Sequence, residues 1–218
     1  MTLEGYALEQ VRPGHVLGLG TGRAAERFVR ALAARVASGL EIRAVATSRA
    51  TAELAGSLGI PVIPLDDAPR VDLAVDGADE VDPDGRMIKG YGGALLREKV
   101  VAAAAERVVI LVGTEKCVPR LGTRGRLPVE VLPFALAPVR RRLAELGVPG
   151  TVRLREDLPQ ASDNGNLLVD CSIGPLADPD ELDRILHAIP GLLETGLFLE
   201  CRAEIAVERA DGVEIRTH

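Results

Sequence analysis

VDLAVDGADEVDPDGRMIKGYGGALLREK, from Val71 to Lys99, is the stretch that decides the fold. Its first residues, 71–75, form an apolar run with the length of a buried strand. Asp76 and Asp79 follow at once, and a glycine-rich run then leads into a helical pattern that carries Glu98. Open α/β sheets bind ligands at the carboxyl ends of their strands. The stretch therefore predicts a parallel sheet and, at its edge, a site rich in carboxylates.

Strand and helix patterns alternate around this stretch. Apolar periodicity predicts strands at 15–20, 41–47, 61–65 and 107–113, and helices at 23–37, 48–58 and 92–106. Such alternation is typical of a mostly parallel sheet with helices on both faces. The turn residues at 82–85 (DPDG) predict a hairpin that returns residues 87–89 toward the site.

The pattern changes after residues 122–125. Strands are expected at 127–132, 151–156, 166–171 and 193–200, and helices at 137–146 and 178–187. This is the order of a β-α-β-β-α-β module, as in ferredoxin-like folds. We therefore predict two domains in an α/β chain. Residues 1–125 plus 201–218 form the parallel-sheet domain, to which a C-terminal hairpin returns, and residues 126–200 form a smaller α+β domain.

The composition excludes several classes of protein. Net charge is −6 and aromatic residues make up 2%, whereas nucleic-acid binding needs a basic surface and stacking rings. No apolar run approaches the roughly 20 residues that span a bilayer, and no signal peptide is evident. Cys117, Cys171 and Cys201 lie far apart without a CxxC, so neither a disulfide framework nor a zinc site is expected. We expect a cytoplasmic protein without nucleic-acid, membrane or metal partners.

GLGTG, at Gly18–Gly22, follows a predicted strand and opens a predicted helix. Glycines allow backbone N–H groups to approach an anion, and a helix N-terminus favours negative charge. The motif is not a dinucleotide fingerprint, because Arg23 stands where the third glycine belongs, and no Gly-Lys-Ser/Thr makes it a P-loop. We interpret it as a turn that binds a phosphate or a hydroxyl group. A tight turn needed for packing alone is the alternative.

The charged residues of Val71–Lys99 suit proton transfer on a small anionic or polyhydroxy substrate. Asp76 and Asp79 are close enough in the chain to face one ligand. Glu98 suits a general base whose pKa partial burial would raise, and Lys89 suits a partner that stabilises a developing oxyanion. Lys116 follows the strand at 107–113 and is a further candidate. The plainer alternatives are a polar turn, a solvated helix face and a surface lysine.

Five segments carry a family resemblance: GLGTG, VDGADEVD, MIKGYGGALLREK, LVGTEK and LPVEVLP. In this order and spacing the chain resembles ribose-5-phosphate isomerase type A over nearly its whole length. The resemblance implies a Rossmann-like first domain, a lid-like and oligomerising second domain, a homodimer or homotetramer, and no metal or cofactor. The implied reaction interconverts the sugar phosphates D-ribose 5-phosphate and D-ribulose 5-phosphate, in the non-oxidative pentose phosphate pathway, through a cis-enediolate.

The resemblance also implies roles for individual residues. Glu98 matches the catalytic base, and Asp76 matches the aspartate that helps to open the furanose ring. Asp79 and Lys89 match residues that contact sugar hydroxyls and the developing oxyanion. The substrate-binding residues implied in this way are Thr21, Gly22, Arg23, Ala24, Asp76, Gly77, Ala78, Asp79, Lys89, Gly90, Tyr91, Gly92 and Lys116.

Two positions depart from the family pattern. Arg23 and Ala24 stand where the family has Ser-Thr, so two hydroxyl donors are absent. We expect the Arg23 guanidinium to bind the phosphate instead, with bidentate geometry. Tyr91 stands where the family often has glycine, and its ring would either crowd the loop or stack on the sugar.

Two other functions stay open. Another sugar-phosphate isomerase or deaminase on a similar fold would commonly rely on a histidine near its site, and the chain contains only three histidines. A non-catalytic sugar-phosphate sensor would need the binding residues alone. The presence of Glu98 together with Asp76, Asp79 and Lys89 favours catalysis over sensing.

Overall fold

The structure is a computed structural model that describes residues 1–217; His218, which we assigned to the first domain, lies outside the described residues. The chain divides into two compact units. The first contains Met1–Ala78, Arg97–Cys117 and the segment from Cys201, and the second contains Asp79–Leu96 and Val118–Glu200. Residues 79–96 and 118–125 thus group with the second unit, whereas the sequence analysis placed them in the first domain. Strand pairing explains part of this difference, because Met87 and Ile88 pair with Phe198 and Leu197 of the second unit.

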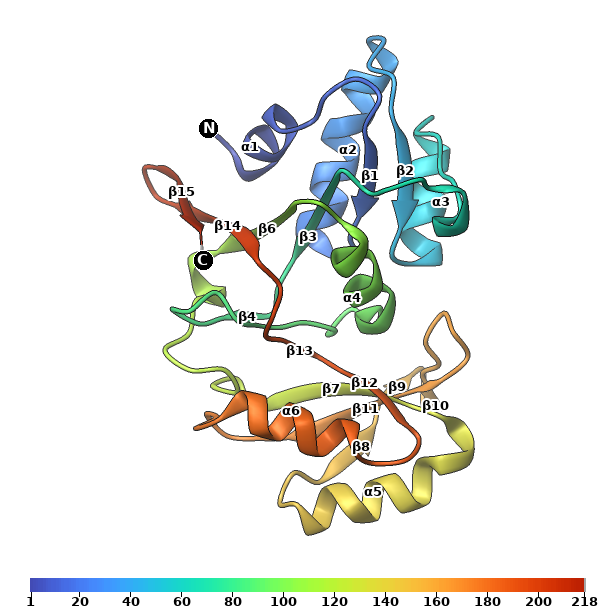
Figure 1. Cartoon of the computed structure of the whole chain (residues 1–218), viewed down its shortest axis with the longest axis vertical. Coiled ribbons are helices and arrows are strands. Elements are labelled where there is room, and N and C mark those ends of the chain that lie inside the picture. Colours follow the sequence, from blue (N-terminus) through green and yellow to red (C-terminus); the bar gives the residue numbers. More distant parts are fainter. Residues whose placement is uncertain (218) are drawn as a thin grey trace. The chain divides into compact units, whose positions relative to one another are not determined.

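The first unit is built on a six-stranded sheet with the order β15-β14-β6-β3-β1-β2 (Figure 1). All neighbouring pairs are parallel except the C-terminal hairpin β14–β15. The strands are β1 (Val16–Leu19), β2 (Arg43–Ala46), β3 (Leu73–Gly77), β6 (Val108–Gly113), β14 (Ala203–Arg209) and β15 (Gly212–Thr217). The helices are α1 (Leu3–Glu9), α2 (Arg23–Ala37), α3 (Arg49–Ser57) and α4 (Leu95–Ala104), with short 3₁₀ turns at η1 (Leu65–Asp67) and η2 (Thr114–Lys116).

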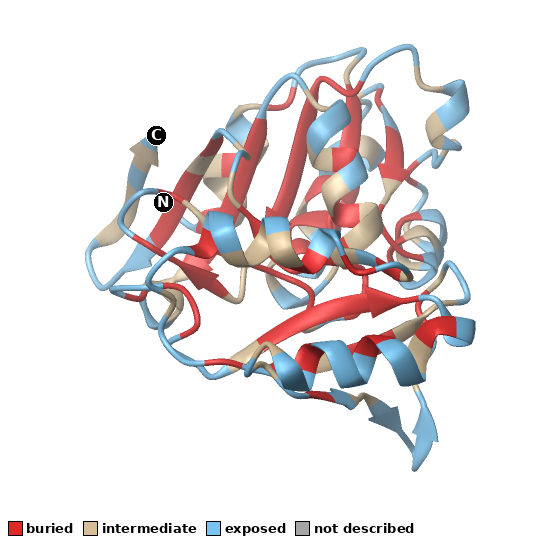
Figure 2. Cartoon of the chain, turned by 60° about the horizontal axis from the view of Figure 1, so that its bottom comes forward, coloured by how far each residue is buried: buried red, intermediate tan, exposed pale blue. Residues whose placement is uncertain are grey.

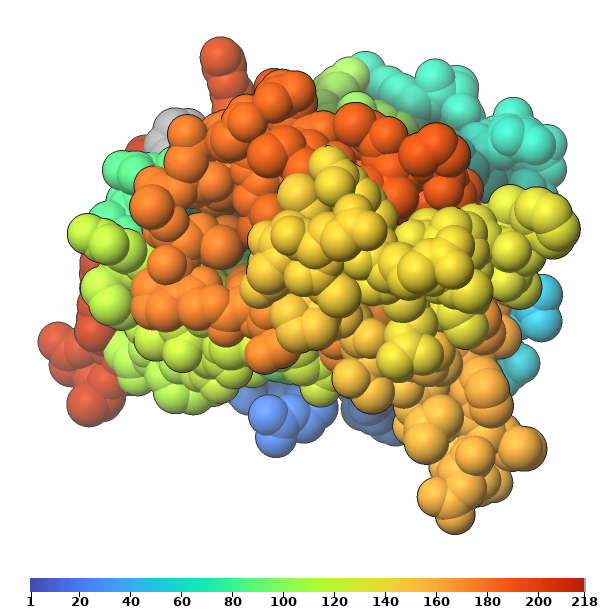
Figure 3. Space-filling view, turned by 90° about the horizontal axis from the view of Figure 1, so that it is seen from below, coloured from blue at the N-terminus to red at the C-terminus, as the bar shows by residue number. Residues whose placement is uncertain are grey.

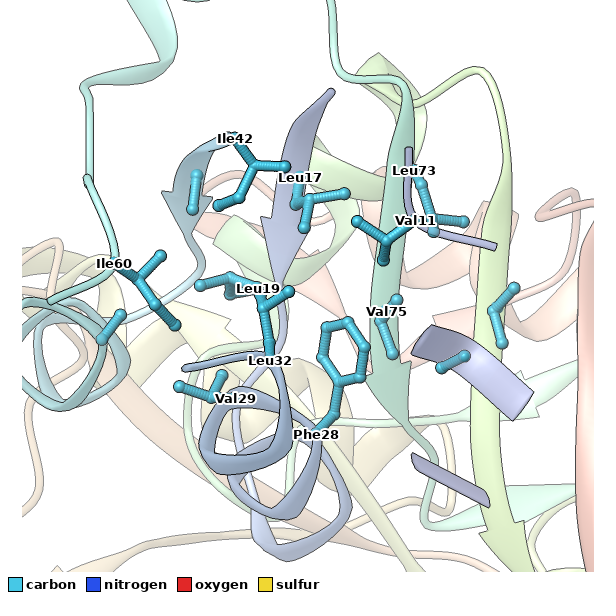
Figure 4. Packing of buried hydrophobic residues seen from close by; sticks show 14 of the residues in the cluster. Val11, Leu17, Leu19, Phe28, Val29, Leu32, Ile42, Ile60, Leu73 and Val75 are labelled. Carbon is cyan, nitrogen blue, oxygen red and sulfur yellow. The ribbon is translucent and has the colours of Figure 1, made fainter. Parts of the chain in front are cut away.

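One face of this sheet is covered by α2. Phe28, Val29 and Leu32 recur at helical spacing and are fully buried. Figure 4 shows them packed toward Leu17 and Leu19 of β1. Burying a side chain of this size stabilises the fold by about 1.5–3 kcal/mol. The apolar spacing that predicted the helix is therefore the same spacing that fastens it to the sheet.

The opposite face is covered by α4. Side chains alternate along a strand, so Gly18 faces away from Leu17 and Leu19. A Cβ atom added to Gly18 would lie 2.5 Å from Cγ1 of Val101. The absence of a side chain at Gly18 thus allows α4 to pack closely on β1. Helices cover both faces of the sheet, and the predicted α/β class is confirmed.

The strand order reverses between β1 and β3. From β1 the chain passes through α2 to β2 on one side, and from β3 it passes through α4 to β6 on the other. In open α/β sheets the carboxyl ends of the strands at such a reversal form the usual ligand-binding position. The turn after β1 and the end of β3 meet here, because the N–H of Gly20 donates to the carbonyl oxygen of Val75 at 2.9 Å.

The second unit contains the predicted β-α-β-β-α-β module. Its four-stranded antiparallel sheet has the order β12-β7-β11-β8. The elements are β7 (Arg126–Val131), η3 (Pro133–Ala135), α5 (Leu136–Glu145), β8 (Gly150–Val152), β11 (Leu167–Ser172), α6 (Pro179–His187) and β12 (Leu192–Thr195). Two smaller sheets complete the unit: β9 (Leu154–Arg155) with β10 (Leu158–Pro159), and β4 (Glu80–Val81) with β5 (Met87–Ile88) and β13 (Leu197–Phe198).

Helices α5 and α6 pack on one face of the four-stranded sheet. Alternate residues of β7 (Leu127, Val129 and Val131) pack with Val139 of α5 and Leu186 of α6 in one apolar core. Figure 2 shows most strands of the two larger sheets buried and the helices buried along one side, whereas β9, β10 and β15 are largely exposed or half-buried. Pro128 and Glu130 on β7, and Leu168 and Asp170 on β11, occupy the alternate positions that face away from this core.

Several local predictions differ from the structure. Residues 61–65 form no strand; a single bridge joins Ala44 to Val62, because Pro61 and Pro64 have no N–H to donate to a ladder. The expected strand at 193–200 is two short strands, β12 and β13, in different sheets. Helix α1, with Thr2 as its N-cap, was not predicted. The hairpins at 82–85 and near the C-terminus are confirmed as β4–β5 and β14–β15.

Candidate active site

Asp76 is the penultimate residue of β3 and is 6% exposed. Leu73 and Val75 point into the core shared with α2. By alternation Asp76 faces the other side of the sheet, which α4 covers. Two backbone donors hold its Oδ1 atom: the N–H of Gly77 at 2.7 Å and the N–H of Thr21 at 3.2 Å. The carboxylate is therefore fixed in place at the reversal of strand order.

Gly20 provides the space that this carboxylate occupies. A Cβ atom added to Gly20 would overlap the carboxyl carbon and Oδ1 of Asp76, and would lie 2.6 Å from its Cβ. The second glycine of GLGTG therefore serves packing, which was our alternative interpretation of the turn. The same turn also presents backbone N–H groups, because the N–H of Thr21 already holds Asp76.

The remainder of the turn leads into α2. Gly22 has φ +116°, a conformation that favours glycine, and no side chain caps the helix. Arg23, the first helical residue, is exposed, and Ala24 is half-buried. An α-helix leaves its first N–H groups without intrahelical partners, and its N-terminus attracts anions. This part of the turn keeps the features that an anion-binding interpretation requires.

Four hydroxyl groups lie together behind the turn. The Thr21 hydroxyl is 2.8 Å from that of Thr47 and 2.9 Å from that of Ser48. Thr51 donates to the carbonyl oxygen of Gly20 at 2.9 Å. Thr47, Ser48 and Thr51 are buried, and the sequence analysis did not select them. Ser48 gave a signal as a predicted helix N-cap, but nothing local connects that cap with a turn about 27 residues earlier in the chain.

Glu98 lies in the first turn of α4 and is 3% exposed. Because β3 and β6 are parallel, the helix that joins them runs opposite to the strands, and its N-terminus lies at their carboxyl ends. Val101, one turn later on the same helix face, packs over Gly18. Glu98 therefore lies farther toward the carboxyl end of β1, on the sheet face that carries Asp76.

Lys116 lies at the same edge. It ends η2, which follows directly after β6, and β6 neighbours β3 in the sheet. Its side chain is half-buried. The structure thus brings Thr21, Asp76, Glu98 and Lys116 to the carboxyl edge of one sheet, although they are far apart in sequence.

The second unit carries the predicted site residues Asp79 and Lys89 to Gly92. Lys89 follows β5, is 4% exposed, and holds its ammonium 5.4 Å from the centre of the Phe198 ring. Its N–H donates to the carbonyl oxygen of Gly196 at 2.9 Å. Asp79 accepts the N–H of Tyr91 at 2.9 Å. The loop from Lys89 to Gly92 is therefore tied to its unit through its backbone.

Tyr91 is used in packing within the second unit. Its ring lies against the Arg126 guanidinium, 4.5 Å from ring centre to Cζ, and its hydroxyl donates to the carbonyl oxygen of Arg126 at 3.2 Å. Burial, assisted by the charges of Glu80 and Asp79, raises the pKa of Tyr91 to about 12. The phenol stays neutral at physiological pH.

The chain crosses between the two units next to these residues. It leaves the first unit between Ala78 and Asp79 and returns between Leu96 and Arg97. Gly77 and Ala78, predicted substrate contacts, come just before the first crossing, and both are half-buried.

Among residues 1–217, no group of three or more His, Cys, Asp or Glu side chains is arranged to hold a metal ion. No disulfide joins Cys117, Cys171 and Cys201. Within the described chain, every helix is too short or too polar to cross a membrane.

Comparison with known proteins identifies relatives along almost the whole chain. Residues 43–212 match the family model of ribose 5-phosphate isomerase A (phosphoriboisomerase A). The ribose-5-phosphate isomerase A of Roseiflexus sp. strain RS-1 is 48% identical over 211 residues, covering 95% of this chain and 91% of the relative. That of Parvibaculum lavamentivorans is 47% identical over 216 residues, covering 96% and 93%.

Solved structures give the same result. The ribose 5-phosphate isomerase A of Methanocaldococcus jannaschii is 35% identical, has a TM-score of 0.94, and covers 100% of this chain and 97% of its own. A D-ribose-5-phosphate isomerase in complex with phospho-erythronic acid is 33% identical, with a TM-score of 0.95 and coverage of 99% and 96%.

Proposed function

Since this chain belongs to the ribose-5-phosphate isomerase A family and interconverts ribose 5-phosphate and ribulose 5-phosphate, we propose which of its residues carry the reaction. The reaction moves one proton from C2 of the aldose to C1. It needs a base that removes the proton from C2 and then donates it to C1. The proposal rests above all on one observation. Glu98 is a nearly inaccessible carboxylate at the start of α4, on the sheet face and at the edge where Asp76 is held.

In the proposed mechanism Glu98 removes the proton from C2 of the open-chain aldose. The electron pair of the broken C–H bond forms the C1–C2 double bond of a cis-enediolate, and negative charge moves to the C1 oxygen. Protonated Glu98 then returns the proton to C1, while the proton of the C2 hydroxyl moves to the C1 oxygen, so that the ketone forms at C2 and a hydroxyl group at C1. One carboxylate on the correct face of the substrate serves both carbons.

We assign Asp76 to the preceding step, the opening of the furanose ring. Opening breaks the bond between C1 and the ring oxygen; the anomeric hydroxyl loses a proton and the ring oxygen gains one. A carboxylate can take the first proton and supply the second. The two N–H groups that hold Oδ1 of Asp76 support this role, because they orient the side chain before substrate binds.

Lys89 and Asp79 are proposed to act on the oxygens of the substrate. The Lys89 ammonium is held in an almost fully buried position, where a fixed positive charge stabilises an oxyanion more strongly than in water. Asp79 accepts hydrogen bonds from sugar hydroxyls, and Gly90, Tyr91 and Gly92 contribute backbone contacts. The bound phospho-erythronic acid in a relative supports a phosphorylated polyhydroxy ligand for this family.

The phosphate is proposed to bind at Thr21–Ala24, with Lys116 as a further contact. Helix α2 runs for 15 residues behind this turn, and no side chain caps its N-terminus. The exposed Arg23 adds a guanidinium where the family has a hydroxyl residue. Gly77, whose Cβ position would lie 3.5 Å from Cβ of Ala24, keeps the neighbouring strand end close to the turn.

Replacing Arg23 with alanine is expected to raise KM for ribose 5-phosphate about 10- to 100-fold with little change in kcat, because a hydrogen bond to a charged group contributes about 1.5–3 kcal/mol. Steady-state kinetics of Arg23→Ala checks this. The matched control is Arg30→Ala, two turns along α2, where the arginine pairs with Glu26. A KM equal to that of the control variant would show that Arg23 does not bind the phosphate.

A direct assay distinguishes an isomerase from a non-catalytic sugar-phosphate sensor. Purified protein is incubated with D-ribose 5-phosphate in the presence of EDTA, and the formation of ketose is followed. Turnover supports the proposed chemistry without a divalent metal. Binding without turnover, in protein that is folded by circular dichroism, would contradict it and favour a sensor. Conversion of a different aldose phosphate alone would favour another isomerase or deaminase on this fold.

We also propose a cytoplasmic enzyme that forms a homodimer or homotetramer, with the second unit serving as lid and as surface for self-association. Phe134 of η3 is 95% exposed, beside an open groove of about 700 Å³ lined by apolar residues of α5 and α6 such as Pro138 and Ile185. Figure 3 looks onto this surface, with α5 in yellow and α6 in orange. A protruding ring beside an apolar groove lets two copies related by a two-fold axis insert their rings reciprocally.

Phe134→Glu is therefore expected to lower the mass of the particle, because a charge in an apolar interface is costly to bury. Size-exclusion chromatography with light scattering measures the mass at micromolar concentration. Ile215→Glu, on β15 of the first unit, is the control, since Ile215 is also exposed, at 37%. A monomeric wild-type protein, or a Phe134→Glu variant of unchanged mass, would contradict this surface as the interface.

A further inference from the structure

The second unit contains an ion-paired group that the proposed mechanism does not use: Arg126, Arg153 and Asp170. Arg153 meets the Asp170 carboxylate with two bonds, Nε to Oδ2 at 3.0 Å and Nη2 to Oδ1 at 2.6 Å. Arg126 adds a third, Nη2 to Oδ2 at 2.9 Å. The side chain of Arg153 is 9% exposed and that of Asp170 is 19% exposed. The geometry is bidentate, and such pairs fix orientation as well as charge.

The remaining nitrogen of the Arg153 guanidinium, Nη1, contacts the loop that follows Lys89. Nη1 of Arg153 donates to the carbonyl oxygens of Gly90 at 3.1 Å and Tyr91 at 3.0 Å. The carbonyl of Gly90 also accepts the N–H of Gly93 at 3.0 Å, which closes a turn. Arg126, the other partner of Asp170, lies on the Tyr91 ring. Both arginines paired with Asp170 therefore contact the same short loop.

The planarity of the peptide bond sets the consequence of these contacts. A trans peptide directs its N–H opposite to its C=O. With the Gly90 carbonyl on Arg153, the N–H of Tyr91 points the other way, where Asp79 accepts it. With the Tyr91 carbonyl on Arg153, the N–H of Gly92 is likewise turned away from Arg153. Arg153 and Asp79 thus hold the loop from opposite sides.

The loop needs such support. Gly90 and Gly93 have φ values of +102° and +90°, so glycine at both ends leaves the backbone few intrinsic restraints. Burial tends to raise the pKa of Asp170, but hydrogen bonds and charge from Arg153 and Arg126 outweigh it, so the pKa lies below its usual value. Asp170 therefore remains ionised, and Arg153 remains clamped, throughout the neutral pH range.

We propose that Arg153, clamped by Asp170, is a positioning residue that holds the Lys89–Gly92 loop in the conformation that isomerisation requires. The inference rests on the proposed function, in which Lys89 and this loop contact the substrate. Arg153 acts through the loop carbonyls and is not itself a catalytic residue. Asp170 acts one step farther away by fixing the guanidinium, and Arg126 braces the loop through the Tyr91 ring.

Arg153→Met removes all the guanidinium bonds and is expected to lower kcat about 100-fold, the usual cost of displacing a catalytic group by about 1 Å. Arg153→Lys keeps the charge without the fork and is expected to recover less than a tenth of the lost activity. Asp170→Asn is expected to fall between wild type and Arg153→Met. Amide hydrogen exchange at residues 90–93 should accelerate in all three variants, which a general loss of stability would not confine to this loop.

The matched control is Glu130→Gln. Glu130 is fully buried on β7, and its Oε1 accepts hydrogen bonds from Ser162, Asn164 and Asn166, none of which belongs to the 89–93 loop. We expect it to lower Tm while kcat and KM stay near wild type. If Arg153→Met matched this control in both Tm and kcat, the positioning role would be overturned. If Arg153→Met does not fold, the kinetics of Arg153→Lys decide in the same way.

Lys89→Met, measured in parallel, separates this inference from the proposed function. Loss of activity in Lys89→Met with wild-type kcat and KM in Arg153→Lys and Asp170→Asn overturns the inference alone. Wild-type activity in Lys89→Met would instead overturn the assignment of the loop to the substrate, and the inference with it. Loss in Lys89→Met together with loss and accelerated exchange in the Arg153 variants supports both.

Discussion

Glu98→Gln is expected to lower kcat about 10²- to 10⁴-fold while the protein stays folded, because this is the usual contribution of a positioned general acid–base group. Glutamine has almost the same shape as glutamate but cannot accept the C2 proton. Glu98 is nearly inaccessible, so a substitution of similar size also avoids leaving a cavity. Steady-state assays of ketose formation measure kcat, and circular dichroism with a thermal melt measures the fold.

Two further variants sharpen this test. Glu98→Asp keeps the carboxylate but withdraws it by one methylene, so activity should lie between those of wild type and Glu98→Gln. Glu53→Gln, on the exposed surface of α3, makes the same chemical change away from the site and should keep full activity. Near-normal turnover in Glu98→Gln would rule out Glu98 as the base. Exchange of the C2 proton with solvent should also fall in that variant, because the same base removes it.

Gly20→Ala is expected to lower kcat/KM about 100-fold, although it adds only a methyl group at a residue that takes no part in the chemistry. The new Cβ would overlap the carboxyl group of Asp76, so that side chain has to move. Movement of about 1 Å at a catalytic group costs about two orders of magnitude. Overpacking adds a loss of stability of about 1–3 kcal/mol. Kinetics and denaturant unfolding, measured together, separate the two effects.

Gly56→Ala is the control for this substitution. Gly56 lies in α3 with open space around its Cβ position and no positive φ, so alanine fits there without strain. Alanine within a helix is better than glycine by about 0.5–1 kcal/mol, and we expect a small gain in stability with unchanged activity. If Gly20→Ala behaved like this control, Asp76 would not depend on the space at Gly20.

Much of the fold was predictable because its signals are local. The strands around 15–20 and 107–113 are continuous apolar runs, and α2 repeats its buried residues at helical spacing. The proline-rich segment at 61–65 was wrong as a strand, since its apolar residues imitate one while Pro61 and Pro64 remove the donors that a ladder needs. The strand expected at 193–200 divides at Gly196, where a Cβ atom would overlap the carbonyl oxygen of Lys89. That close approach involves residues more than 100 positions apart.

The candidate site also contains residues that local sequence patterns predicted and residues that they did not. Asp76, Glu98 and Lys116 were predicted because each stands next to a strand or helix end whose pattern is visible in the sequence. Thr47, Thr51 and Arg153 were not, because their partners at residues 20–21 and 90–91 are distant in the chain. Asp170 was not predicted either, because its partners, Arg153 and Arg126, lie on other segments. A threonine in a helix or an arginine between two strands looks like any other until the pairing of strands brings it to a particular loop.

By itself the sequence determined most of the strands and helices, the α/β class, the glycines that permit close approach, and the acids and lysines available for proton transfer. These follow from periodicity and chemistry within a few residues. Only the tertiary structure decided that Asp76 and Glu98 face the same side of one sheet, that Gly20 makes room for a carboxylate, and that Arg153 holds a loop more than 60 residues earlier. Strand register and the direction of the crossover helix set these relations, and both result from long-range packing that no local pattern encodes.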